Sequence, residues 1–234
     1  MNSVIPVRWQ CLSAFLLRLM IPVLCLGPAS CSGKPELPVL SAADSLEIIR
    51  ENIEHRAEVD SFFRTDPGSP FKRDTTVEYH GIRWYPIEPR FRVYSTLHLY
   101  EHPDTVVVKG TKGEDRRELR YGYFQFVLPD TSGAPREVRL NVYKFTPYDG
   151  QRYLLYRDNL SVWFTDLTTG KETYGVGRYI DVGNEVPDAG HVYEIDFNKA
   201  YNPYCAYSAM YSCAVPRKED HLDLAVRAGE LTYH

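Results

Sequence analysis

The sequence lacks the patterns that identify several common classes of protein. Its 27 Lys and Arg residues are outnumbered by 31 Asp and Glu residues, and the resulting net charge of −4 argues against a nucleic-acid partner. The seven histidines show no His-Glu-x-x-His spacing, so we expect no metal site and no cofactor. A Gly-x-Ser-x-Gly segment is also missing, which counts against an ordinary serine esterase.

The N-terminal apolar stretch, residues 19–26, is shorter than the roughly 20 residues that a membrane-spanning helix needs. Because it follows Arg8 and Arg18 and precedes small residues, it is typical of a signal peptide over residues 1–30. The four residues that end at Cys31, Pro-Ala-Ser-Cys, resemble the bacterial lipobox. We therefore expect Cys31 to be lipidated and the lipid to hold the protein on a membrane of the bacterial cell envelope. The alternative is simple secretion with a shifted cleavage site.

Residues 31–40 contain two prolines among polar residues and are predicted to form an extended tether. Residues 41–234 are long enough for one globular domain. Its clearest element is a helix over residues 41–63, which Ser41 can cap, with Asp44 three positions further on as in a capping box. Apolar residues then recur at helical spacing, and we expect them to pack on a sheet. This predicted stripe consists of Leu46, Ile49, Ile53 and Ala57.

The remainder of the domain is rich in aromatic and β-branched residues, with Gly and Pro between them, which favours strands and turns. The predicted strands cover residues 76–79, 82–85, 91–99, 105–108, 118–127, 138–145, 153–156, 160–164, 173–174, 178–181 and 193–195. Because the turn signals lie close together, we expect most strand pairs to be antiparallel. The sequence thus predicts a mainly β domain, either an antiparallel β-sandwich or an open β-barrel, with one N-terminal α-helix packed on it.

Five segments, taken in order, resemble the DUF1684 family of bacterial and archaeal proteins. They are residues 69–71 (SPF), 81–86 (GIRWYP), 173–179 (TYGVGRY), 196–205 (DFNKAYNPYC) and 228–230 (AGE). The resemblance extends over nearly all of the chain that follows the signal peptide, which implies a single domain. The family has no established activity, so the resemblance implies no function.

The most polar of these segments supply the candidate ligand-binding residues. Arg178 follows two glycines at the start of a predicted strand, where it can either pair with Asp181 or Asp196 inside the fold or receive an anionic group of a ligand. Asn and Asp side chains after a strand can likewise stabilise a rigid turn or line a pocket. The candidate ligand-binding residues are Arg178, Tyr179, Asp196, Asn198, Tyr201, Asn202 and Glu230.

Cys205 and Cys213 are the only cysteines of the domain after Cys31. In an oxidising compartment they are a candidate disulfide across a short loop. The alternatives are two packed thiols, a metal site, or a catalytic thiol that His191 or His221 would serve as base.

Two classes of function follow from these residues. The first is an envelope-anchored module that binds a small molecule or a carbohydrate through the polar Arg, Asp and Asn residues. The second is a hydrolase in which Asp196 or Glu230 acts as base, or Cys205 as nucleophile. A purely structural role in the envelope is a further alternative.

Overall fold

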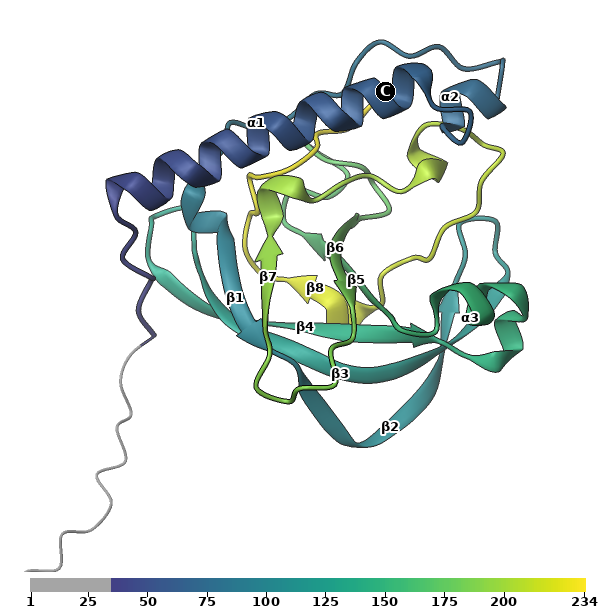
Figure 1. Cartoon of the computed structure of the whole chain (residues 1–234). Helices are drawn as coiled ribbons and strands as arrows, with labels where there is room; N and C mark the ends of the chain where they lie inside the picture. Colours follow the sequence, from purple (N-terminus) through teal and green to yellow (C-terminus); the bar gives the residue numbers. More distant parts are fainter. Residues whose placement is uncertain (1–34) are drawn as a thin grey trace, which may run out of the picture. The chain divides into compact units, whose positions relative to one another are not determined.

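The structure, a computed structural model, describes residues 35–234. The predicted signal peptide and Cys31 lie outside the described residues. Within the described part of the chain, no helix is both long and apolar enough to cross a membrane. Figure 1 shows one long helix that crosses over curved sheets, with irregular connections closing the upper side.

Strands dominate the domain, and their pairing is almost entirely antiparallel. A larger sheet has the order β2-β3-β4-β5-β6, and a smaller one pairs β1 with β7. Only the short β8 is parallel to its neighbour, β5. The larger sheet does not close into a barrel within the described residues. The predicted mainly β fold with an N-terminal helix is therefore confirmed, as antiparallel sheets that remain open. The strands are β1 (Arg92–Thr96), β2 (His98–Lys109), β3 (Asp115–Pro129), β4 (Pro135–Phe145), β5 (Asn159–Asp166), β6 (Arg178–Asn184), β7 (Val192–Asp196) and β8 (His221–Leu222).

The helices are α1 (Ala42–Thr65), α2 (Pro70–Arg73) and α3 (Gln151–Tyr156). Helix α1 begins as predicted, because the Ser41 side chain accepts from the backbone N–H of Asp44 while the Asp44 carboxylate accepts from Ser41. Its packed face, however, is not the predicted one. Leu46 and Ile53 are largely exposed, and the buried positions are Ile48, Asn52 and Phe63.

The physical reason for this difference is a polar anchor on the buried side of α1. Asn52 Nδ2 donates to Asp196 Oδ2 at 2.9 Å, and Arg56 Nη2 donates to the carbonyl of Tyr85 at 3.0 Å. A buried carboxylate needs donors, so these contacts turn the face with Asn52 and Arg56 toward the sheets and the aliphatic stripe with Ile53 toward solvent.

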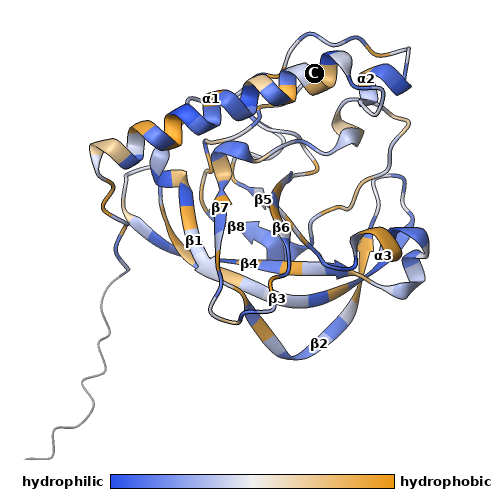
Figure 2. Ribbon diagram, in the orientation of Figure 1, coloured by the Kyte–Doolittle hydropathy of each residue, from blue (hydrophilic) through white to orange (hydrophobic). Residues whose placement is uncertain are grey.

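Four of the predicted strands do not form within residues 35–234. Residues 153–156 form the end of helix α3 instead of a strand, and its Leu154 and Leu155 are more than 70% exposed. Figure 2 shows this block of hydrophobic residues on α3. Residues 76–79 and 82–85 form no strand, and Trp84 makes only a single bridge to Glu230. At residues 173–174 there is only an isolated bridge between Thr173 and Thr169. In these places the chain forms a helical turn, an irregular segment or a single bridge. The periodicity of so short a segment cannot distinguish these from a strand.

The larger sheet carries a different set of residues on each face, because successive side chains of a strand point to opposite sides. One face builds the main core, and each of its fully buried aliphatic or aromatic side chains contributes about 1.5–3 kcal/mol. This core includes Phe124, Leu140, Leu160, Val162, Phe164 and Ile180. The alternate positions Tyr143, Trp163 and Tyr179 lie on the other face, where they pack with Val106, Val108 and Ala214.

Candidate functional site

Arg178 lies at the start of β6 and is only 1% exposed. Its Nη2 donates to the carbonyl of Val226 at 2.8 Å and to Asp166 Oδ2 at 3.4 Å, and its Nη1 donates to the carbonyl of Ala228. The carboxylate partner is thus Asp166, and not Asp181 or Asp196 as predicted. Arg178 fixes the C-terminal segment to the sheet, and no face of its guanidinium is open to a ligand.

Glu230 is fully buried close to Arg178. Its Oε2 accepts from the backbone N–H of Asn202 at 2.8 Å and from the hydroxyl of Tyr207 at 2.5 Å. Burial raises the pKa of Glu230 to about 7, against these hydrogen bonds and the charge of Arg178. The preceding Gly229 has a φ of 81°, and a Cβ there would lie 2.5 Å from the carbonyl of Ala200, so only glycine fits.

Asp196 and Asn198 belong to a second buried network, at the end of β7. Asp196 Oδ2 accepts from Arg92 Nε at 2.9 Å as well as from Asn52, and its Oδ1 accepts from the backbone of Asn198 at 2.9 Å. Asn198 Oδ1 in turn accepts from the backbone N–H of Glu88 at 2.9 Å. This network joins α1, β1 and β7.

The structure therefore does not bring the candidate ligand-binding residues together on an open surface. Five of them have at most 3% exposure and hold the chain together: Arg178, Asp196, Asn198, Asn202 and Glu230. Asp196 and Glu230, the two candidate bases of the hydrolase alternative, are buried in these two networks. Only Tyr179 and Tyr201 line a cavity.

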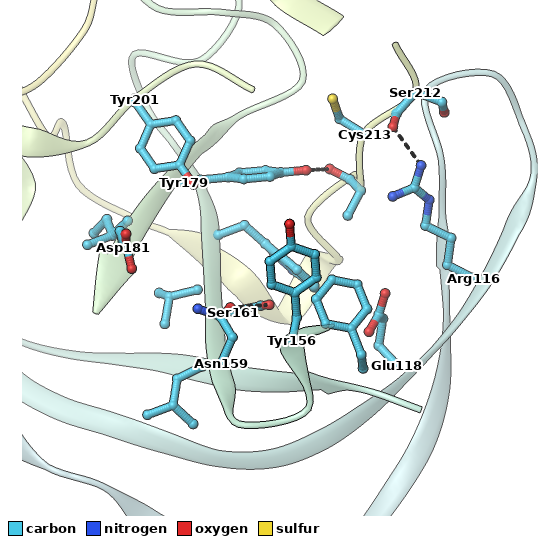
Figure 3. A pocket seen from close by; sticks show the side chains of 16 residues that line it. Arg116, Glu118, Tyr156, Asn159, Ser161, Tyr179, Asp181, Tyr201, Ser212 and Cys213 are labelled. Atoms are coloured by element: carbon cyan, nitrogen blue, oxygen red, sulfur yellow. Dashed lines mark hydrogen bonds between the residues drawn. The ribbon is translucent and has the colours of Figure 1, made fainter. Parts of the chain in front are cut away.

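That cavity has a volume of about 310 Å³ and lies over the second face of the larger sheet (Figure 3). Its floor comes from β3, β4, β5 and β6, its walls from the chain around Tyr201 and residues 212–214, and Tyr156 of α3 stands at its edge. The polar and aromatic side chains that line it are Arg116, Glu118, Phe145, Tyr156, Asn159, Ser161, Trp163, Tyr179, Asp181, Tyr201, Ser212 and Cys213. We refer to it as the Glu118 pocket.

Aromatic rings form a row across the floor of the Glu118 pocket. Trp163 stacks on Tyr143 with ring centroids 4.7 Å apart, and Tyr179 is tilted against Trp163 at 5.8 Å. Tyr201 meets Tyr179 edge to face at 5.9 Å. The Tyr179 hydroxyl donates to the carbonyl of Ala214 at 2.6 Å, which fixes the wall to the floor. These contacts give the pocket a preformed shape.

Glu118 is 3% exposed, and no hydrogen bond or ion pair among residues 35–234 engages its carboxylate. Burial is the main cause that raises its pKa to about 7; Asp149 adds to this effect, and Arg116 and Arg152 oppose it. The neighbouring Arg116 is already engaged, because its Nη2 donates to Glu114 at 2.8 Å and to the carbonyl of Ser212 at 2.6 Å. The nearly buried indole N–H of Trp163 also has no partner.

Sequence reasoning missed Glu118 because it alternates with Arg116 and Arg120, as on a solvent-facing side of a strand. The side of β3 that carries these residues is instead covered by residues 212–214. This segment lies about 100 residues further along the chain and pairs with the β2–β3 turn. A register shift between Arg120 and Gly122 further disturbs the alternation. No local signal could have found this site.

Cys205 and Cys213 are adjacent, half-buried free thiols. The backbone N–H of Cys205 donates to Cys213 Sγ at 3.3 Å, and the Tyr174 hydroxyl donates to Cys205 Sγ at 3.7 Å. Hydrogen bonding with the Cys213 side chain is the main cause that lowers the pKa of Cys205 to about 6. The disulfide stays a prediction.

The catalytic-thiol and metal-site interpretations of the cysteines gain no support from their surroundings. His221 contacts Thr165 at 3.0 Å and His191 packs on Tyr193, so neither histidine is engaged with a thiol. Within residues 35–234, no group of three or more His, Cys, Asp or Glu side chains is arranged to hold a metal ion.

Comparison with known proteins defines the class of this chain. The family described as "Protein of unknown function (DUF1684)" matches residues 77–231, so the chain belongs to that family. An uncharacterised protein of Haloarcula marismortui, solved by NMR in solution, is 29% identical. The similarity covers 83% of this chain and all of that one, with a TM-score of 0.54. No curated protein matches the chain.

Proposed function

We propose that this protein is a binding module for a small polar molecule, which it holds in the Glu118 pocket. The observation that supports the proposal is the Glu118 carboxylate, which lines the cavity at 3% exposure without a hydrogen-bond donor from residues 35–234. A buried carboxyl group without a partner lowers stability, so an arrangement of this kind points to a donor that the ligand brings.

The other walls fit a ligand of about the size of a monosaccharide. A volume of about 310 Å³ lies at the lower end of the range for small-molecule sites. The rings of Trp163, Tyr179 and Tyr201 offer flat apolar surfaces, and Asn159, Ser161 and Asp181 offer hydrogen-bonding groups. This combination suits a compact molecule with both apolar and hydroxylated faces.

The envelope location forms the second part of the proposal. Cys31 follows two small residues, and residues 31–41 separate it from the start of α1. Fully extended, these residues reach at most roughly 40 Å, which would hold the domain close to the membrane surface. A lipidated Cys31 would therefore place the binding module at the membrane.

The test is a titration of ¹⁵N-labelled protein, residues 35–234, with a library of monosaccharides, polyols and small amines. We expect at least one compound to shift the amide signals of residues around Glu118, Trp163 and Tyr201 in a saturable way. Tyr201→Ala should weaken that binding about tenfold or more, because a lining ring is removed. Tyr94→Ala, which removes an exposed tyrosine outside the pocket, should not. If every compound leaves these signals unmoved, the proposal is contradicted.

A further inference from the structure

We propose that the ligand of the Glu118 pocket is an organic cation whose protonated amine pairs with the Glu118 carboxylate. This inference rests on the proposed function and adds the charge of the ligand to it. It follows from two features of the described residues: the balance of charge in the pocket, and the aromatic rings there that no Arg or Lys side chain contacts.

The charges that line the pocket are not balanced. Glu118 and Asp181 are acidic, and Arg116 is the only basic residue among the lining side chains. The guanidinium of Arg116 already pairs with Glu114 at 2.8 Å, outside the pocket lining. Its charge is therefore largely compensated, and Glu118 has no cation of its own. A positively charged ligand would restore the balance, whereas an anion would meet two carboxylates.

Cationic side chains of this domain contact aromatic rings elsewhere, but not the rings of the pocket. Arginine and lysine side chains stack on other rings of this domain, for example Arg117 over Tyr148 at 4.4 Å and Lys144 over Tyr121 at 4.8 Å. Among residues 35–234, no such contact uses Tyr156, Trp163, Tyr179 or Tyr201. Tilted and edge-to-face rings beside a carboxylate form the kind of site that recognises amines and quaternary ammonium groups.

The ionisation of Glu118 links binding to pH. The charged groups that act on it are Asp149, Arg116 and Arg152, which come from the β4–α3 connection, β3 and α3. Without a ligand, burial keeps the pKa of Glu118 at about 7, so the carboxylate is largely protonated below that pH. A cation requires the ionised form, and its affinity should therefore fall as pH decreases from about 8 to about 6.

Pairs of compounds that share a skeleton and differ only in charge test the inference. We would titrate the protein, residues 35–234, with glucamine against sorbitol and with cyclohexylamine against cyclohexanol at pH 8. In the wild type, each amine should bind about tenfold or more tightly than its alcohol, the ratio expected for one charge-assisted hydrogen bond. Glu118→Gln should remove this preference, because its uncharged amide no longer pairs with an ammonium group.

The matched control is Glu101→Gln, the same change at a side chain that is 91% exposed, which should retain the preference. The amide spectrum of Glu118→Gln would verify that this variant is folded. Equal affinity for both members of each pair, or a preference that survives in Glu118→Gln, would overturn the cation inference while the proposed pocket remains valid. If no member of the pairs or of the library binds, the proposed function itself is contradicted.

Discussion

Arg178, Glu230 and Glu118 are nearly buried charged residues that differ in their surroundings. Arg178 donates to three backbone carbonyls and to Asp166, and Glu230 accepts from Asn202 and Tyr207. Glu118 has no such partner among the described residues. A satisfied buried charge holds a structure together, whereas an unsatisfied one at a cavity is available to a ligand. Arg178 Nε and Glu230 Oε1 have no partner either, so Glu118 differs in that its carboxylate makes no hydrogen bond to residues 35–234 and lines a cavity.

Arg178→Met should destabilise the domain by about 3–5 kcal/mol, because it leaves the buried Asp166 carboxylate without its cation. Urea denaturation followed by tryptophan fluorescence would measure the loss. Arg227→Met, which removes an exposed ion pair with Glu172, should cost at most about 1 kcal/mol. Equal losses in both variants would show that Arg178 is not a structural anchor.

Glu118 should make the stability of the domain depend on pH. Its pKa of about 7 in the folded state lies above the ordinary value of 4.5. Between these values the folded state binds a proton that the unfolded state has released, so the free energy of unfolding falls as pH rises from about 4.5 to about 7. As pH rises from 5 to 8, the free energy of unfolding of Glu118→Gln should increase by about 2–3 kcal/mol relative to that of the wild type.

Urea denaturation of both proteins at several pH values would measure this difference. Glu230, whose pKa is also about 7, should leave a residual pH dependence in the Glu118→Gln variant. Parallel curves for wild type and variant would refute the assignment of a buried, unpaired carboxyl to Glu118.

Cys205 and Cys213 should form a disulfide under oxidising conditions, because their side chains are adjacent and Cys205 has a lowered pKa. Closing this short loop should stabilise the domain by roughly 2–3 kcal/mol. The intact mass after alkylation, with and without reductant, would detect the bond, and Cys205→Ser would serve as the control. Full alkylation of the non-reduced wild type would contradict the prediction.

Helix α1 shows how an element can be predicted correctly and oriented wrongly. The capping box at Ser41 and Asp44 is a local signal, and the helix begins there. The orientation depends on Asp196, which lies 144 residues after Asn52 in the sequence and fixes that side of the helix to the end of β7. A strong polar contact with a distant partner thus outweighs the aliphatic pattern within the helix.

Ile48→Ala should cost about 2–4 kcal/mol, because Ile48 is buried between α1 and the rest of the domain. Ile53→Ala should change stability by less than about 0.5 kcal/mol, since its side chain is 57% exposed. The two variants carry the same change on opposite sides of α1. Their denaturation midpoints would therefore decide whether the side with Ile48 or the side with Ile53 packs on the domain. A larger loss for Ile53→Ala would contradict the packing of α1.

The molecule as a whole has its main hydrophobic core and the Glu118 pocket on opposite faces of its larger sheet. One face carries the main hydrophobic core, and the networks of Arg178 and Asp196 attach the C-terminal segment and α1. The other face carries the aromatic row, Glu118 and the wall of residues 212–214.

The proposed lipid anchor is tested on the chain of residues 1–234. We expect labelled fatty acid to be incorporated into the wild-type chain expressed in a bacterium, and not into the Cys31→Ser variant, because the modified group is the thiol that follows the cleavage site. Cys205→Ser should incorporate as much label as the wild type. Equal labelling of the wild type and Cys31→Ser would contradict lipidation at this position.

The mainly β fold, the start of α1 and the family resemblance could be derived from local patterns. Alternation along β4 and β5, turn residues between strands and the Ser41 capping box depend on neighbours within a few positions, so the sequence contains them directly. The polar residues near Arg178 and Asp196 were also recognised as unusual, although their role could not be assigned.

Tertiary contacts decided that role and the location of the candidate site. Whether Arg178 faces a ligand or Asp166, and whether Glu118 faces solvent or a covered cavity, depends on the C-terminal segment and residues 212–214, which return over the sheet from far along the chain. The free energy of a charged side chain is set by the dielectric and the partners around it, and these come from segments that no local pattern connects.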